Sequence, residues 1–342
     1  MDHPLLDPQG ARRLLLGNEA IVRGALEAGV NVVTCYPGTP SSEVPDLFSA
    51  LAPSGRFVFE YSVNEKVALE VSAGAALAGA MCLVTMKHVG LNVAADPLLT
   101  MTYTGLPGGL VILSADDPGC HSSQNEQDNR TYARFAQLPC FEPASAQEAK
   151  DMAKAAFLLA RETEQPVLLR TTTRVSHLRG PVNFGPLPAP APLEAFVRNP
   201  GRFVPVPAVA RLRHKALAAA MEAVVRKSEQ SPFNRADQDS KTSSVGVIAS
   251  GISRAYLHDA LESANWREAV RVCELGLTWP LPLGLLEDFL RSLSVVLILE
   301  EGEPLLENAL RALAQEKGLQ TRIVGKQDPL TRFGEYSTPL VR

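Results

Sequence analysis

The chain has 342 residues, of which 46% are hydrophobic and 20% charged, and its formal net charge is -4. This balance is typical of a globular protein with enough residues for two domains, and it excludes an intrinsically disordered chain. The sequence has no basic stripe with interleaved aromatic residues, which argues against a nucleic-acid partner.

No apolar stretch approaches the ~20 residues needed to cross a bilayer, so we expect no membrane-spanning segment. Residues 1–10 lack the basic end and apolar run of a signal peptide, which favours a cytoplasmic location. The five cysteines are scattered and form no Cys-x-x-Cys pair. Because zinc sites and iron–sulfur clusters need several converging thiolates, we expect neither on this chain, and no disulfide.

Residues 1–180 alternate between strand and helix patterns. The strands are expected at 30–35, 57–59, 82–86, 110–114 and 166–170, and the helices at 18–28, from 41 onward, at 64–80 and at 146–161. Short β-branched runs that end in turns and alternate with helices predict a parallel sheet with helices on both faces.

A proline-dense stretch follows at 180–207 and indicates an extended linker, because proline interrupts helices and central strands. One helix is expected at 208–226, and then a polar, mobile stretch at 227–244. A second α/β unit has expected strands at 245–249, 270–273, 295–299 and 321–324, with helices up to 264 and at 304–315. The predicted fold class is therefore α/β, with two doubly wound, mostly parallel three-layer αβα domains (1–180 and 245–342) joined by a Pro-rich linker (181–244).

In open α/β sheets, ligands bind beyond the carboxyl ends of the strands. Four turns are expected at that edge of the first domain, at 36–42, 60–65, 87–92 and 116–128. Each candidate residue there also has an ordinary structural explanation. Glu65 is either a functional acid or a carboxylate that the helix dipole stabilises, and Thr39 either holds an anion or caps a helix. His88 and His121 are either ligand-contacting groups or ordinary loop histidines, and the small-residue helix at 72–80 either packs on its own sheet or contacts a subunit or cofactor.

Together, these segments resemble the alpha subunit of indolepyruvate:ferredoxin oxidoreductase. The resemblance rests on Leu16-Gly17-Asn18-Glu19-Ala20, Tyr36-Pro37-Gly38-Thr39-Pro40-Ser41-Ser42-Glu43, Glu60-Tyr61-Ser62-Val63-Asn64-Glu65-Lys66, the run from Met86 to Pro97, the run from Ser114 to Asp128, Arg170-Thr171-Thr172-Thr173-Arg174-Val175-Ser176-His177, and Leu299-Glu300-Glu301-Gly302-Glu303-Pro304. The run from Met86 to Pro97, which begins Met86-Lys87-His88-Val89-Gly90-Leu91-Asn92, is highly specific.

The resemblance implies a thiamine-diphosphate pyrimidine-type domain followed by a transketolase-C-terminal-like domain. It implies that Glu65 is the glutamate that hydrogen-bonds the aminopyrimidine ring of thiamine diphosphate, with Lys87, His88 and Asn92 lining the cofactor. Thr39, His88 and His121 are the implied substrate contacts. Such enzymes decarboxylate a 2-oxoacid oxidatively, pass electrons to ferredoxin and form an acyl-coenzyme A. Asp116 and Asp117 stand near where related pyruvate enzymes have a carboxylate-binding arginine, which favours a larger arylpyruvate.

The family's alpha subunit also has a diphosphate-binding domain that begins with Gly-Asp-Gly, and cysteine-rich cluster motifs, and this sequence contains neither. The resemblance therefore implies that Mg²⁺ and the [4Fe-4S] clusters belong to a partner chain, alongside a gamma/beta-type subunit, in a homo- or hetero-oligomer. Either the gene is split or the chain is a fragment. Two other functions stay open, a non-catalytic interaction protein on this scaffold and a subunit of a non-oxidative two-chain thiamine-diphosphate enzyme.

Overall fold

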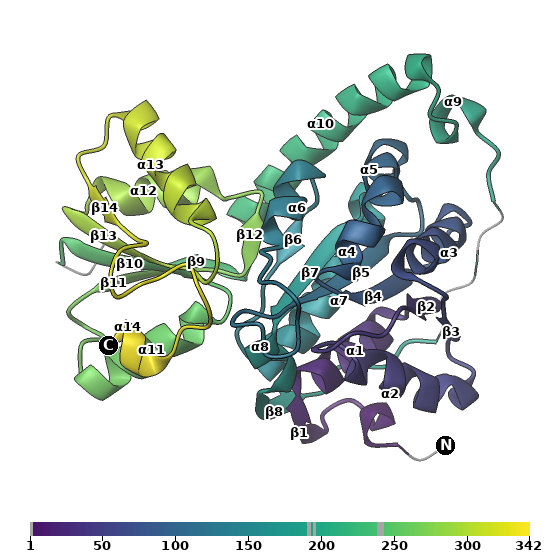
Figure 1. The fold of residues 1–342 in the computed structure, drawn as a ribbon, viewed down its shortest axis with the longest axis horizontal. Coiled ribbons are helices and arrows are strands. Elements are labelled where there is room, and N and C mark those ends of the chain that lie inside the picture. The colour runs from purple at the N-terminus through teal and green to yellow at the C-terminus, as the bar shows by residue number, and fades with distance from the viewer. Residues whose placement is uncertain (1–2, 190–192, 194–195, 238–242) are drawn as a thin grey trace.

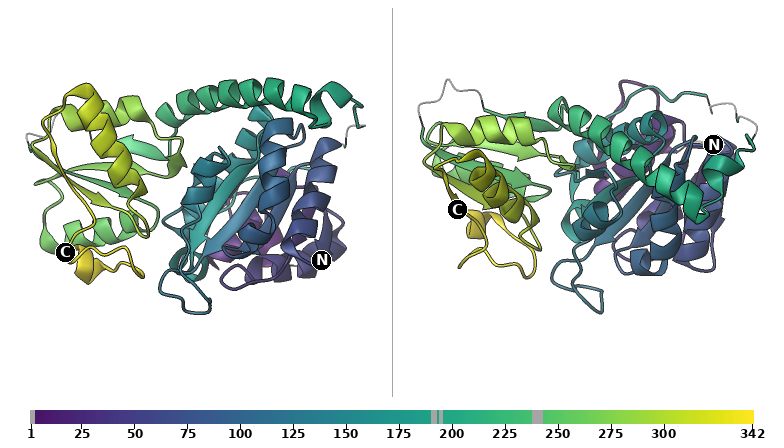
Figure 2. Two further views of the ribbon diagram at one scale, coloured as in Figure 1. Left: turned by 45° about the horizontal axis from the view of Figure 1, so that its top comes forward. Right: turned by 90° about the horizontal axis from the view of Figure 1, so that it is seen from above.

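A computed structural model describes residues 3–189, 193, 196–237 and 243–342. Within these ranges the chain forms two α/β domains that stand side by side (Figure 1). The long helix α10 (Pro207–Glu229) runs across the first domain toward the second, as both views in Figure 2 show. The predicted fold class is confirmed. None of the helices described is long and apolar enough to span a membrane.

The first domain is built on a seven-stranded sheet with the order β12-β6-β7-β5-β4-β2-β3. All neighbouring strands are parallel except β12, which pairs antiparallel with β6. The strands are β2 (Val32–Cys35), β3 (Val58–Tyr61), β4 (Cys82–Lys87), β5 (Leu110–Asp116), β6 (Cys140–Phe141), β7 (Val167–Thr172) and β12 (Leu277–Trp279).

Helices cover both faces of this sheet. The helices of the domain are α1 (Gly17–Ala28), α2 (Glu43–Leu51), α3 (Glu65–Leu77), α4 (Gly90–Val93), α5 (Ala95–Thr104), α6 (Arg130–Phe135), α7 (Ala146–Thr163) and α8 (Thr173–His177), with 3-10 turns at Pro4–Leu6 and Ala52–Ser54. One apolar core joins α1, α2 and α7 to the sheet, and a second joins α3, α5 and α6 to its other face. Gly29 ends α1 in the left-handed conformation (φ 82°), in agreement with the helix expected at 18–28.

The small-residue helix α3 packs closely on its own sheet. The Thr34 hydroxyl lies 2.7 Å from the Ala68 carbonyl oxygen and 2.8 Å from the Ser72 hydroxyl. Ala73 and Ala76 are buried in the same core, whereas a β-carbon on Gly74 would meet nothing within 4 Å. The helix therefore has one face against the sheet and an open face at Gly74.

The segment between the domains differs in part from the predicted linker. Residues 179–183 form β8 (Arg179–Asn183), which pairs antiparallel with β1 (Arg12–Leu16) in a two-stranded ribbon that accommodates Pro181 outside the main sheets. A short helix, α9 (Pro200–Phe203), precedes α10. The range of α10, Pro207–Glu229, includes the helix expected at 208–226 and confirms it. The polar stretch expected at 227–244 instead continues α10 and then forms β9 (Asn234–Ala236), while its residues 238–242 lie outside the described residues.

The second domain has a five-stranded sheet with the order β14-β13-β10-β11-β9, parallel except for β9. Helices α12 and α13 share a core with one face, and α11 and the segment around Leu330 and Tyr336 share a core with the other. The remaining elements are β10 (Val245–Ser250), α11 (Ser253–Ala264), β11 (Arg271–Leu275), α12 (Leu283–Arg291), β13 (Val295–Leu299), α13 (Leu305–Lys317), β14 (Arg322–Val324) and α14 (Thr338–Val341).

Candidate functional site

The predicted site residues follow strands whose carboxyl ends meet at one edge of the seven-stranded sheet. Cys35 at the end of β2 pairs with Tyr61 on one side and Thr85 on the other, and Lys87 at the end of β4 pairs with Ala115. Because these strands are parallel, the turns that follow them emerge together. The structure thus places the turns at 36–42, 60–65, 87–92 and 116–128 at a common edge.

Glu65 is the first residue of α3, and its carboxylate faces Gly90 of α4. A β-carbon on Gly90 would lie 2.5 Å from the Glu65 Oε1 atom and 2.6 Å from its Cγ atom. Asn64 begins the helix, because its side-chain oxygen accepts a hydrogen bond from the Val67 backbone N–H at 2.9 Å. Glu65 is half-buried, and within the described residues its carboxylate has no hydrogen-bond donor and no ion-pair partner.

Lys87 and Thr39 lie on the β4 and β2 sides of the same edge. The Lys87 ammonium donates a 2.7 Å hydrogen bond to the Ser122 carbonyl oxygen, and this ties β4 to the loop after β5. Gly38 packs against Lys87, since a β-carbon on Gly38 would lie 2.7 Å from the Lys87 β-carbon. Thr39 is exposed, and its hydroxyl lies 3.5 Å from the Ser42 hydroxyl. The Thr39 hydroxyl is therefore accessible from solvent.

His88 is fully buried, and only one of its ring nitrogens has a partner among the described residues. Its Nε2 atom lies 3.2 Å from the Asn125 side-chain oxygen and 3.3 Å from the Asn125 carbonyl oxygen. Its Nδ1 atom is buried without a hydrogen-bond partner. A buried polar atom with no partner is costly and is frequent at functional sites.

An amide cluster connects His88 to Asn92. The Gln127 amide nitrogen donates to the His88 carbonyl oxygen at 3.2 Å and to the Asn92 side-chain oxygen at 3.0 Å. Asn92 in turn donates to the Gln127 side-chain oxygen at 2.9 Å, and it accepts from the Tyr132 hydroxyl at 2.8 Å. Asn129 donates to the His88 carbonyl oxygen at 3.0 Å. The loop after β5 therefore holds the turn after β4 in place.

His121 is directed elsewhere. Its ring is exposed, and its Nε2 atom lies 3.3 Å from the Glu335 carboxylate of the second domain. Glu335 also accepts a 2.8 Å hydrogen bond from Arg174. Within the part of the chain that the structure describes, the His121 ring forms no hydrogen bond or ion pair with the other predicted site residues. The structure thus groups Glu65 with Gly90, and His88 with Asn92, but leaves His121 at the domain junction.

A buried charge cluster that was not predicted from the sequence lies between the domains. Arg130 and Arg170 are 6% and 5% exposed, and they pair with Asp116, Asp128, Glu142 and Glu300. Burial alone would raise the pKa of Asp128, but the Arg130 and Arg170 guanidiniums hold it well below its usual range. Burial raises the pKa of Asp116, against the opposing effect of Arg170. The polar run at 116–130 was the signal in the sequence that could have indicated this cluster. Glu300, the partner of Arg130, is too distant in the sequence to be inferred from that run.

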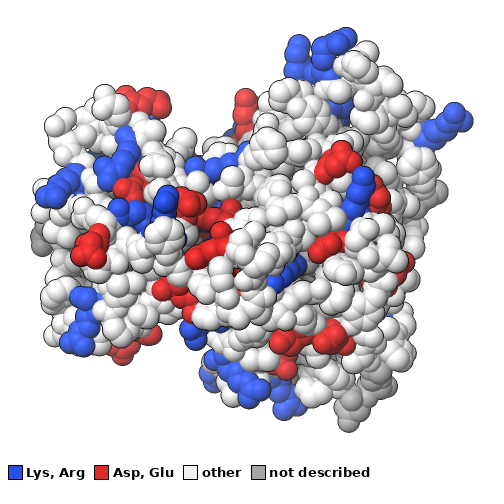
Figure 3. Space-filling model, viewed as in Figure 1, with Lys and Arg blue, Asp and Glu red and all other residues white. Residues whose placement is uncertain are grey.

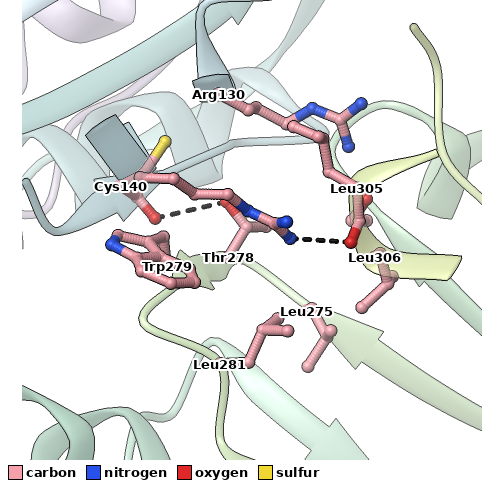
Figure 4. Close-up of a pocket in the computed structure, with 10 residues that line it drawn as sticks. Arg130, Cys140, Leu275, Thr278, Trp279, Leu281, Leu305 and Leu306 are labelled. Carbon is pink, nitrogen blue, oxygen red and sulfur yellow. Dashed lines mark hydrogen bonds between the residues drawn. The ribbon is translucent and has the colours of Figure 1, made fainter. Parts of the chain in front are cut away.

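The cluster borders a small pocket that residues of both domains line. Figure 4 shows Arg130 and Cys140 of the first domain on one side of this pocket, and Leu305 and Leu306 of the second on another. Acidic and basic side chains are also mixed on the surface where the two domains meet (Figure 3). Among the residues with described positions, no group of three or more His, Cys, Asp or Glu side chains is arranged to hold a metal ion.

The fold and the site define an α/β chain with a candidate ligand-binding edge and, within the described residues, an unpartnered carboxylate at a helix start. The family model described as pyruvate flavodoxin/ferredoxin oxidoreductase, thiamine-diphosphate-binding, matches residues 23–202, more than half of the sequence. The chain therefore belongs to this family, which confirms the family resemblance read from the sequence.

Curated relatives agree with this assignment, and solved structures share the fold. The chain is 47% identical over 336 residues to the indolepyruvate oxidoreductase subunit IorA of Methanothermobacter marburgensis, and the match covers 98% of this chain and 54% of that protein. The chain thus spans about half the length of the curated relatives it matches. Its fold is similar to a 2-oxoglutarate:ferredoxin oxidoreductase from Magnetococcus marinus (TM-score 0.76, 14% identity, covering 97% of this chain and 64% of that one). It is also similar in fold to a split-gene transketolase (TM-score 0.59, 19% identity, 92% and 90% covered).

Proposed function

We propose that this chain supplies the pyrimidine-binding half of a thiamine-diphosphate-dependent 2-oxoacid:ferredoxin oxidoreductase that acts on indolepyruvate or a related arylpyruvate. Family membership and the 47% identity to a protein named as an indolepyruvate oxidoreductase subunit support the reaction class and the substrate. The observation that carries the proposal is the Glu65 carboxylate, which is half-buried at a helix start, faces Gly90 and lacks a partner within the described residues.

The residues around Glu65 suit the aminopyrimidine ring of thiamine diphosphate. A carboxylate with free acceptor capacity can accept a hydrogen bond from a ring nitrogen. Because Gly90 has no side chain, the Glu65 carboxylate has room to occupy this position. Lys87, His88 and Asn92 line the same edge and would contact the cofactor. When bound, thiamine diphosphate supplies the electron sink that decarboxylation of a 2-oxoacid requires. The role of Glu65 is to hold a proton at the ring nitrogen and to fix the orientation of the ring.

Two further residues would contact the substrate. The exposed hydroxyl of Thr39 is available to the carboxylate of a 2-oxoacid. The His88 ring is fully buried against Asn125, so it would hold or donate a proton near the 2-oxo group only if the loop at 120–126 changes position. His121 would take part only if the loop at 120–126 changes position, because its ring contacts Glu335. We therefore rank Thr39 above His88 and His121 as a substrate contact.

A partner domain would complete the site. Tyr61 ends β3, Tyr36 and Val63 follow β2 and β3, and Val93 ends α4, the helix after β4. Tyr36, Tyr61, Val63 and Val93 are 39%, 46%, 78% and 50% exposed. Several exposed apolar side chains around a polar site are typical of a surface that another protein surface covers. The proposed partner carries the Mg²⁺ and diphosphate site and the [4Fe-4S] clusters, alongside a gamma/beta-type subunit. Ferredoxin accepts the electrons and coenzyme A accepts the acyl group, in a cytoplasmic oligomer.

The proposal is tested by Glu65→Gln in the complex reconstituted from this chain and its partners. We expect loss of nearly all 2-oxoacid-dependent dye reduction while the complex still assembles, because an amide cannot exchange a proton with the ring nitrogen. Glu70→Gln is the matched control, since Glu70 lies on the same helix with a half-exposed side chain. Unchanged activity of Glu65→Gln would reject Glu65 as the catalytic residue. Equal rates with indolepyruvate, pyruvate and 2-oxoglutarate would reject the substrate class.

A further inference from the structure

Arg130 connects the second domain to the loop that holds the candidate site. Its guanidinium donates to both Asp128 carboxylate oxygens at 2.6–3.1 Å and to Glu300 at 2.7 Å. It also donates to the carbonyl oxygens of Glu301 at 2.5 Å and Glu303 at 2.9 Å. Burial alone would lower the pKa of Arg130, but Asp128 and Glu300 raise it well above its usual value, so it stays charged. One buried cation therefore joins the first domain to residues 300–303.

Asp128 is the point at which this connection enters the site. Its carboxylate accepts a 3.0 Å hydrogen bond from the Glu303 backbone N–H in addition to those from Arg130. Gln127 and Asn129, on either side of it in the sequence, both donate to the His88 carbonyl oxygen, at 3.2 and 3.0 Å. A change in the position of Asp128 must therefore move the two side chains that fix the His88 backbone.

Gly302 is required for the second domain to approach Asp128 this closely. Its φ angle is 75°, which side-chain-bearing residues rarely adopt, and a β-carbon would lie 2.6 Å from the Asp128 Oδ2 atom. Any side chain at residue 302 would therefore push against a carboxylate that Arg130 and the Glu303 N–H hold from other directions. Gly302 has no role in binding or catalysis in the function proposed above.

We propose that Gly302, Asp128 and Arg130 are positioning residues through which the second domain sets the geometry of His88 and Asn92. The inference rests on the proposed function only where it predicts an effect of these residues on the catalytic rate of the complex. The coupling itself is a property of the chain. The second domain then contributes to the site through this contact, although none of the predicted site residues lies in it.

The test compares Gly302→Ala with Gly318→Ala in the full chain. Gly318 also has a positive φ angle, 64°, but a β-carbon there would meet nothing within 4 Å. Both changes therefore strain the backbone of the second domain, and only the first displaces Asp128. The readouts without cofactor are the NMR signals of the His88 ring, assigned with His88→Gln, and hydrogen exchange of the backbone amides of residues 88–92.

We expect Gly302→Ala to shift the His88 signals and to increase exchange at 88–92, and Gly318→Ala to leave both unchanged. In the reconstituted complex, kcat should fall by about tenfold to a hundredfold for Gly302→Ala alone, as expected for a small displacement of positioned groups. Asp128→Asn is the second variant, to be used if Gly302→Ala does not fold. It keeps the size of the side chain and removes its charge, so it should also shift the His88 signals.

If Gly302→Ala and Gly318→Ala give the same His88 ring signals and the same hydrogen exchange at residues 88–92, the proposed coupling between Asp128 and His88 is wrong. This holds whether or not the two variants differ in stability. The two proposals fail in different ways. A shifted His88 signal in a complex that has no 2-oxoacid activity in any form would leave the coupling intact and reject the proposed function. An active complex whose His88 signals do not respond to either Gly302→Ala or Asp128→Asn would reject the coupling alone.

Discussion

The carboxylate of Glu65 occupies the space that a side chain on Gly90 would fill, because a β-carbon on Gly90 would lie 2.5 Å from the Glu65 Oε1 atom. The two residues belong to the starts of different helices, α3 and α4, which follow β3 and β4. The sheet brings those helix starts together, since β2 pairs with both strands. A glycine in a specific motif is thus explained by the position of an acid 25 residues earlier in the sequence.

Gly90→Ala should reduce activity of the reconstituted complex strongly while the fold is kept. The added methyl group must displace the Glu65 carboxylate, and a displacement of about 1 Å at a catalytic group can cost on the order of a hundredfold in rate. Gly90 is helical, so alanine adds no backbone strain there. The measurement is the steady-state rate of 2-oxoacid-dependent dye reduction, alongside the circular dichroism spectrum of the chain.

The control for stability is Gly74→Ala in the isolated chain. Gly74 lies within α3 and has open space around its α-carbon. Alanine in a helix interior is favoured over glycine by about 1 kcal/mol, so this variant should unfold at a higher urea concentration. If Gly90→Ala keeps full activity, the Glu65 carboxylate is free to move without consequence and the steric argument is wrong.

Asn64→Ala should destabilise the start of α3 and loosen the position of Glu65. The change removes the acceptor for the Val67 N–H, which costs about 1 kcal/mol for a typical helix cap. Asn64→Asp keeps an acceptor at the same place and should retain both stability and rate. Urea denaturation and dye reduction measured on the same preparations separate the two effects. Equal stability of the alanine and aspartate variants would contradict the capping role.

The local signals in the sequence predicted most of the first domain, because each depends on neighbouring residues. Gly29 ends α1 and Asn64 begins α3 as expected. The strand β12 was missed, since its partner β6 lies far back in the chain and its three residues are too short a run to indicate a strand. The strand β8 was missed because Pro181 indicated a linker, whereas a two-stranded ribbon tolerates it.

The candidate site was predictable to the same extent. The rule that ligands bind beyond parallel strands placed the turns containing Glu65 and His88 at one edge, because strand direction follows from the alternation of strands and helices. The hydrogen-bond and ion-pair partners of individual side chains were not predictable. His121 pairs with Glu335, and Arg130 with Glu300, through contacts between residues more than 150 positions apart that only the packing of the two domains creates.

Glu301→Gln should make the chain more stable at neutral pH. Burial raises the pKa of Glu301 from 4.5 to about 7, although the Tyr336 backbone N–H donates a 2.8 Å hydrogen bond to it. Below its ordinary pKa the carboxyl group is protonated in the folded and the unfolded chain. As the pH rises, the unfolded chain loses the proton first, so the free energy of unfolding falls until the pH exceeds the folded pKa, by at most about 3 kcal/mol.

Glutamine copies the neutral carboxyl group, so the variant should lack this loss of stability. The measurement is urea denaturation of both proteins between about pH 5 and about pH 7.5, a window that contains the titration of Glu301. Burial lowers the pKa of the neighbouring Lys326 to about 8, so its contribution changes mainly above this window. Glu316→Gln, at an exposed position, should behave like the unaltered chain. Parallel pH profiles for all three proteins would contradict a raised pKa at Glu301.

Arg23 and Glu27 form an ion pair on α1, and both of their side chains are fully buried. Arg23 donates to Glu27 at 2.9 Å and to the carbonyl oxygens of Leu5 and Gly185. It therefore connects α1 to the first residues of the first domain and to the segment that follows β8. Arg23→Met leaves the Glu27 carboxylate buried with fewer partners and should cost about 3–5 kcal/mol.

Arg23→Met with Glu27→Met should cost less than the sum of the two single changes, because no buried charge of the pair is then left without its partner. Lys150, whose ammonium lies 3.2 Å from Glu27 and 2.8 Å from Asp151, keeps the second of these contacts in the double variant. The three variants are compared by urea denaturation at neutral pH. Single effects that add to within about 0.5 kcal/mol would mean that Arg23 acts through its carbonyl contacts and not through Glu27.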